Sequence, residues 1–153
     1  MKSSENRICL LLATIVAGST FVATSIQGAD SVTAKNIAGS WTCASAIIDG
    51  RPLGDDTKKQ LRLTLTADRY KSERGDQVLF DSTYTLDASQ SPAHIDMIGT
   101  EGDLKGKAAL GILQLDGDTL TMCYVMPGKE RPAAFESQPQ SGAFLVVWKR
   151  AAK

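Results

Sequence analysis

The sequence has a single histidine, His94, only three cysteines and no excess of charge, because 17 basic residues balance 17 acidic ones among its 153 residues. A balanced charge gives no electrostatic reason to expect nucleic acid or an anionic membrane surface as a partner. One histidine, without a Cys-x-x-Cys or His-x-x-x-His pattern, cannot complete the ligand shell of a zinc site. We therefore expect no nucleic-acid partner, no metal and no cofactor.

The sequence also lacks a recognisable catalytic constellation. No serine stands in Gly-x-Ser-x-Gly, and any triad would have to use His94. His94 and Asp96 share one face of a predicted strand, where they could support acid–base chemistry, but a solvated strand face explains them more simply. A thiol nucleophile at Cys123 is a remote alternative to a buried cysteine. We predict that the protein is not an enzyme.

The first 28 residues have the three parts of a secretory signal peptide. MKSSENR is short and basic, ICLLLATIVAGSTFVATSI is apolar, and QGAD supplies small residues for cleavage after Gly28 or Ala29, with Ser25 as a further candidate. The apolar run is close to the ~20 residues of a membrane-spanning helix, so a retained anchor is the alternative. We predict export to the periplasm or the cell exterior, with no membrane insertion after cleavage.

Cleavage would leave about 125 residues, which is the usual size of one domain. Its net charge would be near −1, because Lys2, Arg7 and Glu5 are removed from the balanced total. We expect a flexible leader at residues 29–37 and a single domain at residues 38–150.

Two cysteines, Cys43 and Cys123, remain in that exported domain. In an oxidising compartment an even pair favours a disulfide, which would stabilise the fold by ~3 to 4 kcal/mol in the chain-entropy model. The alternative is two buried thiols that pack as small hydrophobic groups.

Short strand-like segments separated by turn residues fill the domain. Residues 61–68, LRLTLTAD, alternate leucine with polar residues, the two-residue period of a half-buried strand. Similar segments are GSWTCASAII, RYKSE, VLFDSTYTLD, AHIDMIG, KAALGILQL, TLTMCYV and AFLVVWK. About eight such segments at regular spacing predict an all-β antiparallel barrel or sandwich. GDDTKKQL, which opens with two acidic residues, is the only helix that we expect.

Residues 110–123, LGILQLDGDTLTMC, predict a hairpin. A two-residue type I′ turn at the Asp-Gly pair would place Leu113 opposite Leu120 and Cys123 opposite Leu110. Cys123 would then be buried. A bulged turn would shift this register by one residue and is the alternative.

Gly39-Ser40-Trp41 matches the Gly-x-Trp that begins the first strand of lipocalin-like barrels. Over residues 37–150 the chain resembles, more particularly, a lipocalin-like domain of unknown function found in predicted exported proteins of planctomycetes. The matching stretches are GSWTCASAIIDGRPL, LRLTLTADRY, AHIDM, LGILQLDGDTLTMCYVMPGKERPAAF and LVVWKR. This resemblance implies a small up-and-down β-barrel and export, and it implies no catalytic activity.

In a closed barrel the first and last strands are neighbours, so Lys149 or Arg150 could stack on the indole of Trp41 and cover one end. This looks like the closing contact of lipocalins, and we expect it to be structural.

The loop GKERP, residues 128–132, places Lys129, Glu130 and Arg131 between two strands at one barrel end, where loops commonly carry recognition. A rigid, solvated turn is the alternative. If the barrel is filled, these residues could contact an envelope protein or a polysaccharide.

An eight-stranded interior is either filled by side chains or holds one small ligand. The inward-facing candidates are Leu61, Leu63, Leu65, Phe80, Tyr84, Leu113, Leu120, Met122 and Tyr124. We predict a non-enzymatic barrel that binds a small apolar or amphipathic molecule at one open end, lined by Tyr84, Met122, Tyr124, Leu63 and Phe80. The alternative is the filled interaction module.

Overall fold

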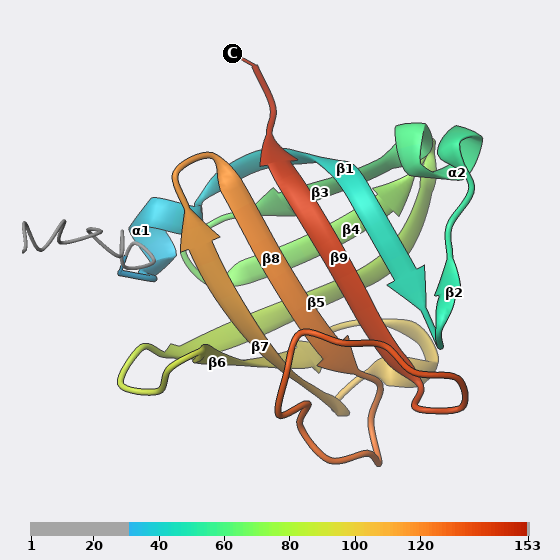
Figure 1. Ribbon diagram of the computed structural model, residues 1–153. Coiled ribbons are helices and arrows are strands. Elements are labelled where there is room, and N and C mark those ends of the chain that lie inside the picture. Colours follow the sequence, from blue (N-terminus) through green and yellow to red (C-terminus); the bar gives the residue numbers. More distant parts are fainter. Residues whose placement is uncertain (1–30, 153) are drawn as a thin grey trace, which may run out of the picture.

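Nine strands account for most of the part of the chain that the structure describes, residues 31–152 of a computed structural model (Figure 1). The strands are β1 (Gly39–Ile48), β2 (Arg51–Pro52), β3 (Leu61–Leu65), β4 (Arg69–Arg74), β5 (Gln77–Asp87), β6 (Ala93–Gly99), β7 (Ala108–Asp116), β8 (Thr119–Val125) and β9 (Ala143–Arg150). The helices are α1 (Ala34–Ile37), α2 (Asp55–Gln60) and the 3₁₀ helix η1 (Gly102–Leu104). The predicted signal peptide lies outside the described residues.

The sheet closes on itself. Starting from β1, the order is β1-β3-β4-β5-β6-β7-β8-β9, every neighbouring pair is antiparallel, and β9 pairs back with β1. The short strand β2 only extends the end of β1. The prediction of an antiparallel barrel of about eight strands with a short helix after the first is therefore confirmed, and α1 and η1 are additions. Closure leaves no long free edge to pair with another chain.

The two-residue alternation of the strands determines the core. Inward-facing apolar side chains from all eight barrel strands form one buried cluster. All nine inward-facing candidates are buried, from Leu63 at 0% exposure to Leu61 at 8%. The leucines of β3 alternate with exposed or half-buried polar residues, as the sequence indicates.

The hairpin between β7 and β8 has a different register from the predicted one. Its two-residue turn is Gly117-Asp118, one position later than expected, so Leu113 lies opposite Met122 and Cys123 lies opposite Ile112. Gly117 has a φ of +54°, and a glycine at the first turn position supplies that left-handed backbone without strain. The expected burial of Cys123 is confirmed, since its exposure is 0%.

The two ends of the barrel differ in construction, and we call them the closed end and the open end. The closed end carries α1 and the turns that join β3 to β4, β5 to β6 and β7 to β8. The open end carries α2, η1, the β4–β5 turn and the long loop 126–142 between β8 and β9 (Figure 1).

The described part of the expected flexible leader is folded onto the closed end, which corrects that expectation. Val32 and Ile37 are buried in the core, at 7% and 0% exposure. The Thr33 side chain caps α1 by accepting a hydrogen bond from the Asn36 backbone N–H at 3.1 Å. A helix of four residues is not stable alone, so burial of its apolar side chains holds it in place.

Loop 126–142 covers part of the outer wall. Phe135 of this loop packs against a small second cluster formed by Ile112, Cys123, Val125 and Ala143. These residues alternate with the inward-facing ones, so the cluster lies outside the barrel. The loop thus buries apolar side chains that would otherwise face solvent.

Candidate ligand-binding site

The open end of the barrel contains a cavity of about 250 Å³. It is lined mainly by apolar side chains, from Ala46, Ile48, Leu53, Thr57, Leu61, Tyr70, Ser72, Arg74, Leu79, Phe80, Tyr124, Met126, Phe144, Val146 and Trp148. Ligand pockets commonly measure ~300 to 1,000 Å³. At about 250 Å³ the cavity lies just below that range, so it is suited to a molecule smaller than a typical drug.

Strand direction gives the depth of each lining residue. β4 runs from the closed end to the open end, so Arg74, its last residue, lies at the mouth. Tyr70 lies four residues deeper, or roughly 13 Å at ~3.3 Å per residue. β9 runs the other way, so Phe144 lies near the mouth and Trp148 lies deep. Leu79, 44% exposed, adds an apolar side chain to the mouth.

Aromatic side chains are scarce in the sequence but gather here. Five of the nine aromatic residues line the cavity: Tyr70, Phe80, Tyr124, Phe144 and Trp148. The rings of Tyr124 and Phe144 are stacked, with centroids 5.1 Å apart and planes 7° apart. Those of Tyr70 and Phe80 are tilted at 56° with centroids 5.9 Å apart. Rings packed in this way form rigid apolar walls.

Two polar atoms belonging to this aromatic wall have no hydrogen-bond partner, namely Tyr70 Oη and Trp148 Nε1. Their side chains are 0% and 2% exposed, so water does not compensate. A buried polar group without a partner costs ~1 to 3 kcal/mol. Among the described residues only Ser82 Oγ shares this condition, and Ser82 does not line the cavity.

The two phenols of the cavity are kept in their protonated form. Burial raises the pKa of Tyr70, although the nearby Tyr124 hydroxyl and Ser72 oppose that rise without forming a regular hydrogen bond to Tyr70 Oη. Burial, followed by the proximity of Tyr70, raises the pKa of Tyr124 well above its ordinary value. Both hydroxyls therefore retain their protons at neutral pH.

The structure brings two of the five expected lining residues to the cavity, Phe80 and Tyr124. The other three need correction. Leu63 and Met122 are fully covered by the packed part of the core, and Tyr84 donates a hydrogen bond to the Thr66 carbonyl at the closed end. Alternation in the sequence indicates which residues face inward, but it does not indicate at what depth the interior is hollow.

Sequence reasoning missed Tyr70 and Trp148, the two deepest aromatic residues of the cavity. The sequence predicts strands at RYKSE and AFLVVWK, so the signal is present. Tyr70 and Ser72 share one face of β4, and Val146 and Trp148 share one face of β9. Extending the inward-facing alternation to these two segments would have identified them.

The expected closing contact is present for one of its two basic residues. The guanidinium carbon of Arg150 lies 4.2 Å from the ring centroid of Trp41. Arg150 also donates hydrogen bonds to the carbonyls of Ala38 at 3.1 Å and Asn36 at 2.8 Å. Lys149 points to the outer face, where it donates to the Thr119 hydroxyl, because successive residues of a strand face opposite sides.

The predicted rim residues have different environments. Lys129 and Glu130 are exposed. Arg131 is half-buried against the outer wall, where it donates to the carbonyls of Ile95 at 3.0 Å and Gly111 at 2.7 Å and pairs with Asp96. Arg131 therefore fastens loop 126–142 to the barrel.

The expected disulfide between Cys43 and Cys123 is absent, because both are free thiols. Cys43 packs against the barrel core, whereas Cys123 belongs to the outer cluster and donates to the Glu136 carbonyl. Their strands, β1 and β8, lie on opposite sides of β9. Two strand spacings amount to ~9.5 Å, which exceeds the ~7 Å that a disulfide can span between Cα atoms. Burial raises the pKa of both thiols.

His94 lies outside the barrel and not in the cavity. It lines a polar pocket of about 140 Å³ on the outer wall together with Asp87, Asp96 and Arg131. Within residues 31–152, no three His, Cys, Asp or Glu side chains are grouped so that they could hold a metal ion.

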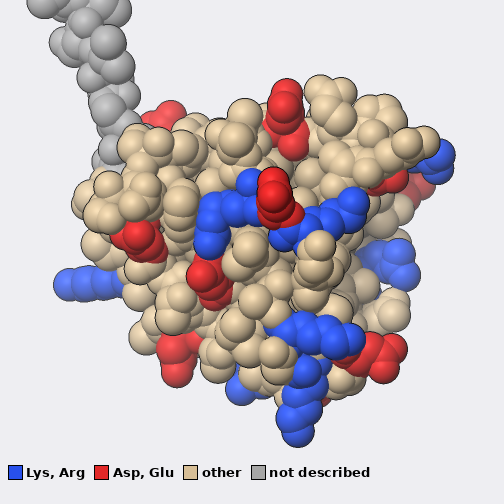
Figure 2. All heavy atoms as spheres, turned by 90° about the horizontal axis from the view of Figure 1, so that it is seen from below, with Lys and Arg blue, Asp and Glu red and all other residues tan. Residues whose placement is uncertain are grey.

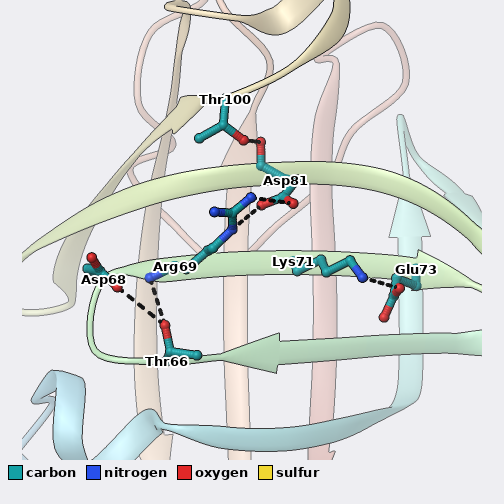
Figure 3. A network of polar contacts seen from close by, with 7 residues as sticks. All are labelled: Thr66, Asp68, Arg69, Lys71, Glu73, Asp81 and Thr100. Carbon is teal, nitrogen blue, oxygen red and sulfur yellow. Dashed lines mark hydrogen bonds and ion pairs between the residues drawn. The ribbon is translucent and has the colours of Figure 1, made fainter.

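The outer wall beside β4 and β5 is stabilised by charge pairing (Figure 3). Arg69 donates two hydrogen bonds of 2.8 Å to the carboxylate of Asp81. These bonds lower the pKa of Asp81, and its backbone carbonyl accepts a further bond from Thr100. Lys71 Nζ forms an ion pair with a carboxylate oxygen of Glu73 at 2.6 Å. The charges of Arg69, Asp81, Lys71 and Glu73 are thus paired with one another on this wall.

Basic and acidic side chains are interspersed on the face shown in Figure 2. In the described part of the chain, no helix is long and apolar enough to span a bilayer. Comparisons with protein-family models, with curated proteins and with solved structures found no match for this chain. The geometry of the cavity is therefore the basis for assigning a function.

Proposed function

We propose that the protein is a non-enzymatic binding protein for a small, mainly apolar molecule, which it holds in the cavity at the open end. The observation that carries this proposal is the apolar, aromatic-walled cavity, whose lining also includes the polar side chains of Thr57, Ser72 and Arg74. Binding sites for small molecules typically combine apolar walls with a few placed polar groups. Export and the likeness to lipocalin-like domains remain part of the proposal and agree with a carrier or scavenger outside the cytoplasm.

The interaction-module alternative has less support. In that alternative, Lys129, Glu130 and Arg131 contact a partner molecule. Arg131, however, already donates hydrogen bonds to two carbonyls and one carboxylate of the barrel wall. Only Lys129 and Glu130 of that trio are left exposed.

The test is to fill the cavity without changing its surroundings. Ala46 lines the cavity and is buried, whereas Ala44 on the same strand is exposed. We expect Ala46→Phe to weaken the binding of naphthalene, a neutral apolar probe, at least tenfold in an equilibrium partition assay. Ala44→Phe, the matched control, should bind like the unmodified protein.

Native mass spectrometry of protein purified from its own cellular compartment provides an independent measurement. We expect an additional mass that is lost on mild denaturation. A bare mass together with no binding of naphthalene would contradict the proposed function. Equal binding by the two phenylalanine variants would show that the probe binds elsewhere.

A further inference from the structure

Within the part of the chain that the structure describes, Arg74 is the one charged side chain that lines the cavity. It ends β4 at the mouth, is exposed, and donates a hydrogen bond to the neutral Gln77 Oε1 at 3.1 Å. Arg69, Arg131 and Arg150, by contrast, each pair with a carboxylate. A guanidinium has five N–H donors, so the bond to Gln77 leaves most of them available to another acceptor.

The carboxylates that lie near Arg74 along the chain do not belong to the cavity. Glu73 precedes it on β4 and pairs with Lys71 at 2.6 Å, and Asp55 pairs within α2 at 2.7 Å. Neither of them lines the cavity, and neither does Asp76 of the β4–β5 turn. A molecule in the cavity would therefore meet one positive charge and no negative charge along the described lining.

Apolar side chains stand at the mouth together with Arg74. Leu79 is an extra residue of β5, at the point where its register with β4 shifts by one. Such a β-bulge re-aims a side chain, and Leu79, which is 44% exposed, lines the cavity together with its neighbour Phe80. Thr57 of α2, half-buried, adds a hydroxyl to the lining. The mouth is therefore amphipathic, whereas the deeper walls are mainly aromatic and apolar.

A molecule that fills the cavity as far as the mouth would cover part of Arg74. Removing a charged group from water is costly unless the new neighbour supplies a partner. A carboxylate is the best partner, because its two oxygens match the guanidinium fork. The same group would be disfavoured at the depth of Tyr70, roughly 13 Å further along β4 at ~3.3 Å per residue, where no cation lines the cavity.

We infer that this cavity, if it binds ligands as proposed above, selects amphipathic monocarboxylates. The apolar tail lies against the aromatic walls, and the carboxylate remains at the mouth, where it pairs with Arg74. A cavity of about 250 Å³ is suited to an alkyl chain of medium length. A cationic amphiphile of the same shape is rejected, because its head group would lie beside a like charge.

The experiment compares three probes with similar tails and different charges: octanoate, the neutral octanamide and octylammonium. Their affinities are measured by isothermal titration calorimetry at neutral pH and low salt, with the unmodified protein and with Arg74→Gln. Arg74 is exposed at the end of a strand, so this substitution should leave the fold intact. Lys35→Gln is the matched control, because it removes the same charge from an exposed position on α1 at the closed end.

We expect the unmodified protein to bind octanoate most tightly and octylammonium most weakly. Arg74→Gln should weaken the binding of octanoate about fivefold, the effect of one partly exposed ion pair, and should change the affinity for octanamide by less than about twofold. Lys35→Gln should change none of the three affinities. Added salt should weaken the binding of octanoate to the unmodified protein more than to Arg74→Gln, because it screens the ion pair.

Equal weakening of octanoate and octanamide by Arg74→Gln would overturn this inference, and so would equal effects of Arg74→Gln and Lys35→Gln on octanoate. Binding of naphthalene by the same protein would then leave the proposed function intact. Failure of octanoate to bind a protein that binds naphthalene would have the same meaning. If neither naphthalene nor any of the octyl probes bound, the proposed function would fail together with the inference.

Discussion

The closed and open ends of the barrel use the same residue types in opposite ways. At the closed end, Trp41 Nε1 donates to the Ile37 carbonyl at 3.0 Å and Tyr84 Oη donates to the Thr66 carbonyl at 2.6 Å. In the deep part of the cavity that opens at the other end, Trp148 Nε1 and Tyr70 Oη have no partner. Both ends bury their aromatic rings, but only one end satisfies their polar atoms. Buried polar atoms without hydrogen-bond partners are unusual in a folded protein, and they are expected near functional sites.

Because of this difference, we expect the closed end to determine stability and the open end to determine binding. The closed end also has a cation–π contact and two backbone carbonyls that accept from Arg150, so its polar groups are paired and its interior is filled. The open end has a cavity and, in its deep part, two uncompensated groups, each of which costs stability. Substitutions at the closed end should therefore affect unfolding, and substitutions at the open end should affect affinity.

The largest effect is expected for Trp41→Ala. Trp41 is fully buried and packs against the core, so truncation should lower the free energy of unfolding by ~3 to 5 kcal/mol, measured by urea denaturation. Trp41→Phe is the milder variant and should still fold. It should bind naphthalene with unchanged affinity, because Trp41 lies outside the cavity lining. Loss of binding in a folded Trp41→Phe protein would show that the two ends are coupled.

A smaller effect is expected for Arg150→Ala, with its neighbour Lys149→Ala as the matched control. Arg150 stacks on Trp41 and donates to two backbone carbonyls. Losing these contacts should cost ~1 to 3 kcal/mol of unfolding free energy. Lys149 is exposed on the outer face, so its removal should change stability by less than ~0.5 kcal/mol. Similar costs for the two variants would mean that the stacking contributes nothing.

The strand pattern was predictable because it rests on local chemistry. The alternating leucines of LRLTLTAD and the turn residues between the segments can be recognised from neighbouring residues alone. The barrel then follows from the number and spacing of the predicted strands. The hairpin register was wrong because a one-position shift of the turn leaves the alternation unchanged. The described leader residues were misassigned because α1 is stabilised by burial of Val32 and Ile37, which no local pattern reveals.

The site was less predictable because depth in a barrel is a tertiary property. Phe80 and Met122 both face inward, yet only Phe80 lines the cavity. The pairing of cysteines depends on which strand separates them and which face each occupies, and β9 lies between Cys43 and Cys123. A sequence cannot indicate that an atom such as Trp148 Nε1 lacks a hydrogen-bond partner, because the neighbours of a buried atom are determined by the tertiary structure.

The smallest effect, and the most direct comparison of the two ends, comes from removing one hydroxyl at each. Tyr84→Phe deletes a bonded hydroxyl and should lower the free energy of unfolding by ~0.5 to 1.5 kcal/mol. Tyr70→Phe deletes an unpartnered hydroxyl and should leave that free energy unchanged or raise it by up to ~1 kcal/mol, measured in the same urea titration without ligand. The two substitutions remove the same atom from the same residue type, so side-chain volume and ring chemistry cancel. Equal losses would mean that Tyr70 Oη is already paired in the empty barrel, and the contrast between the two ends would then disappear.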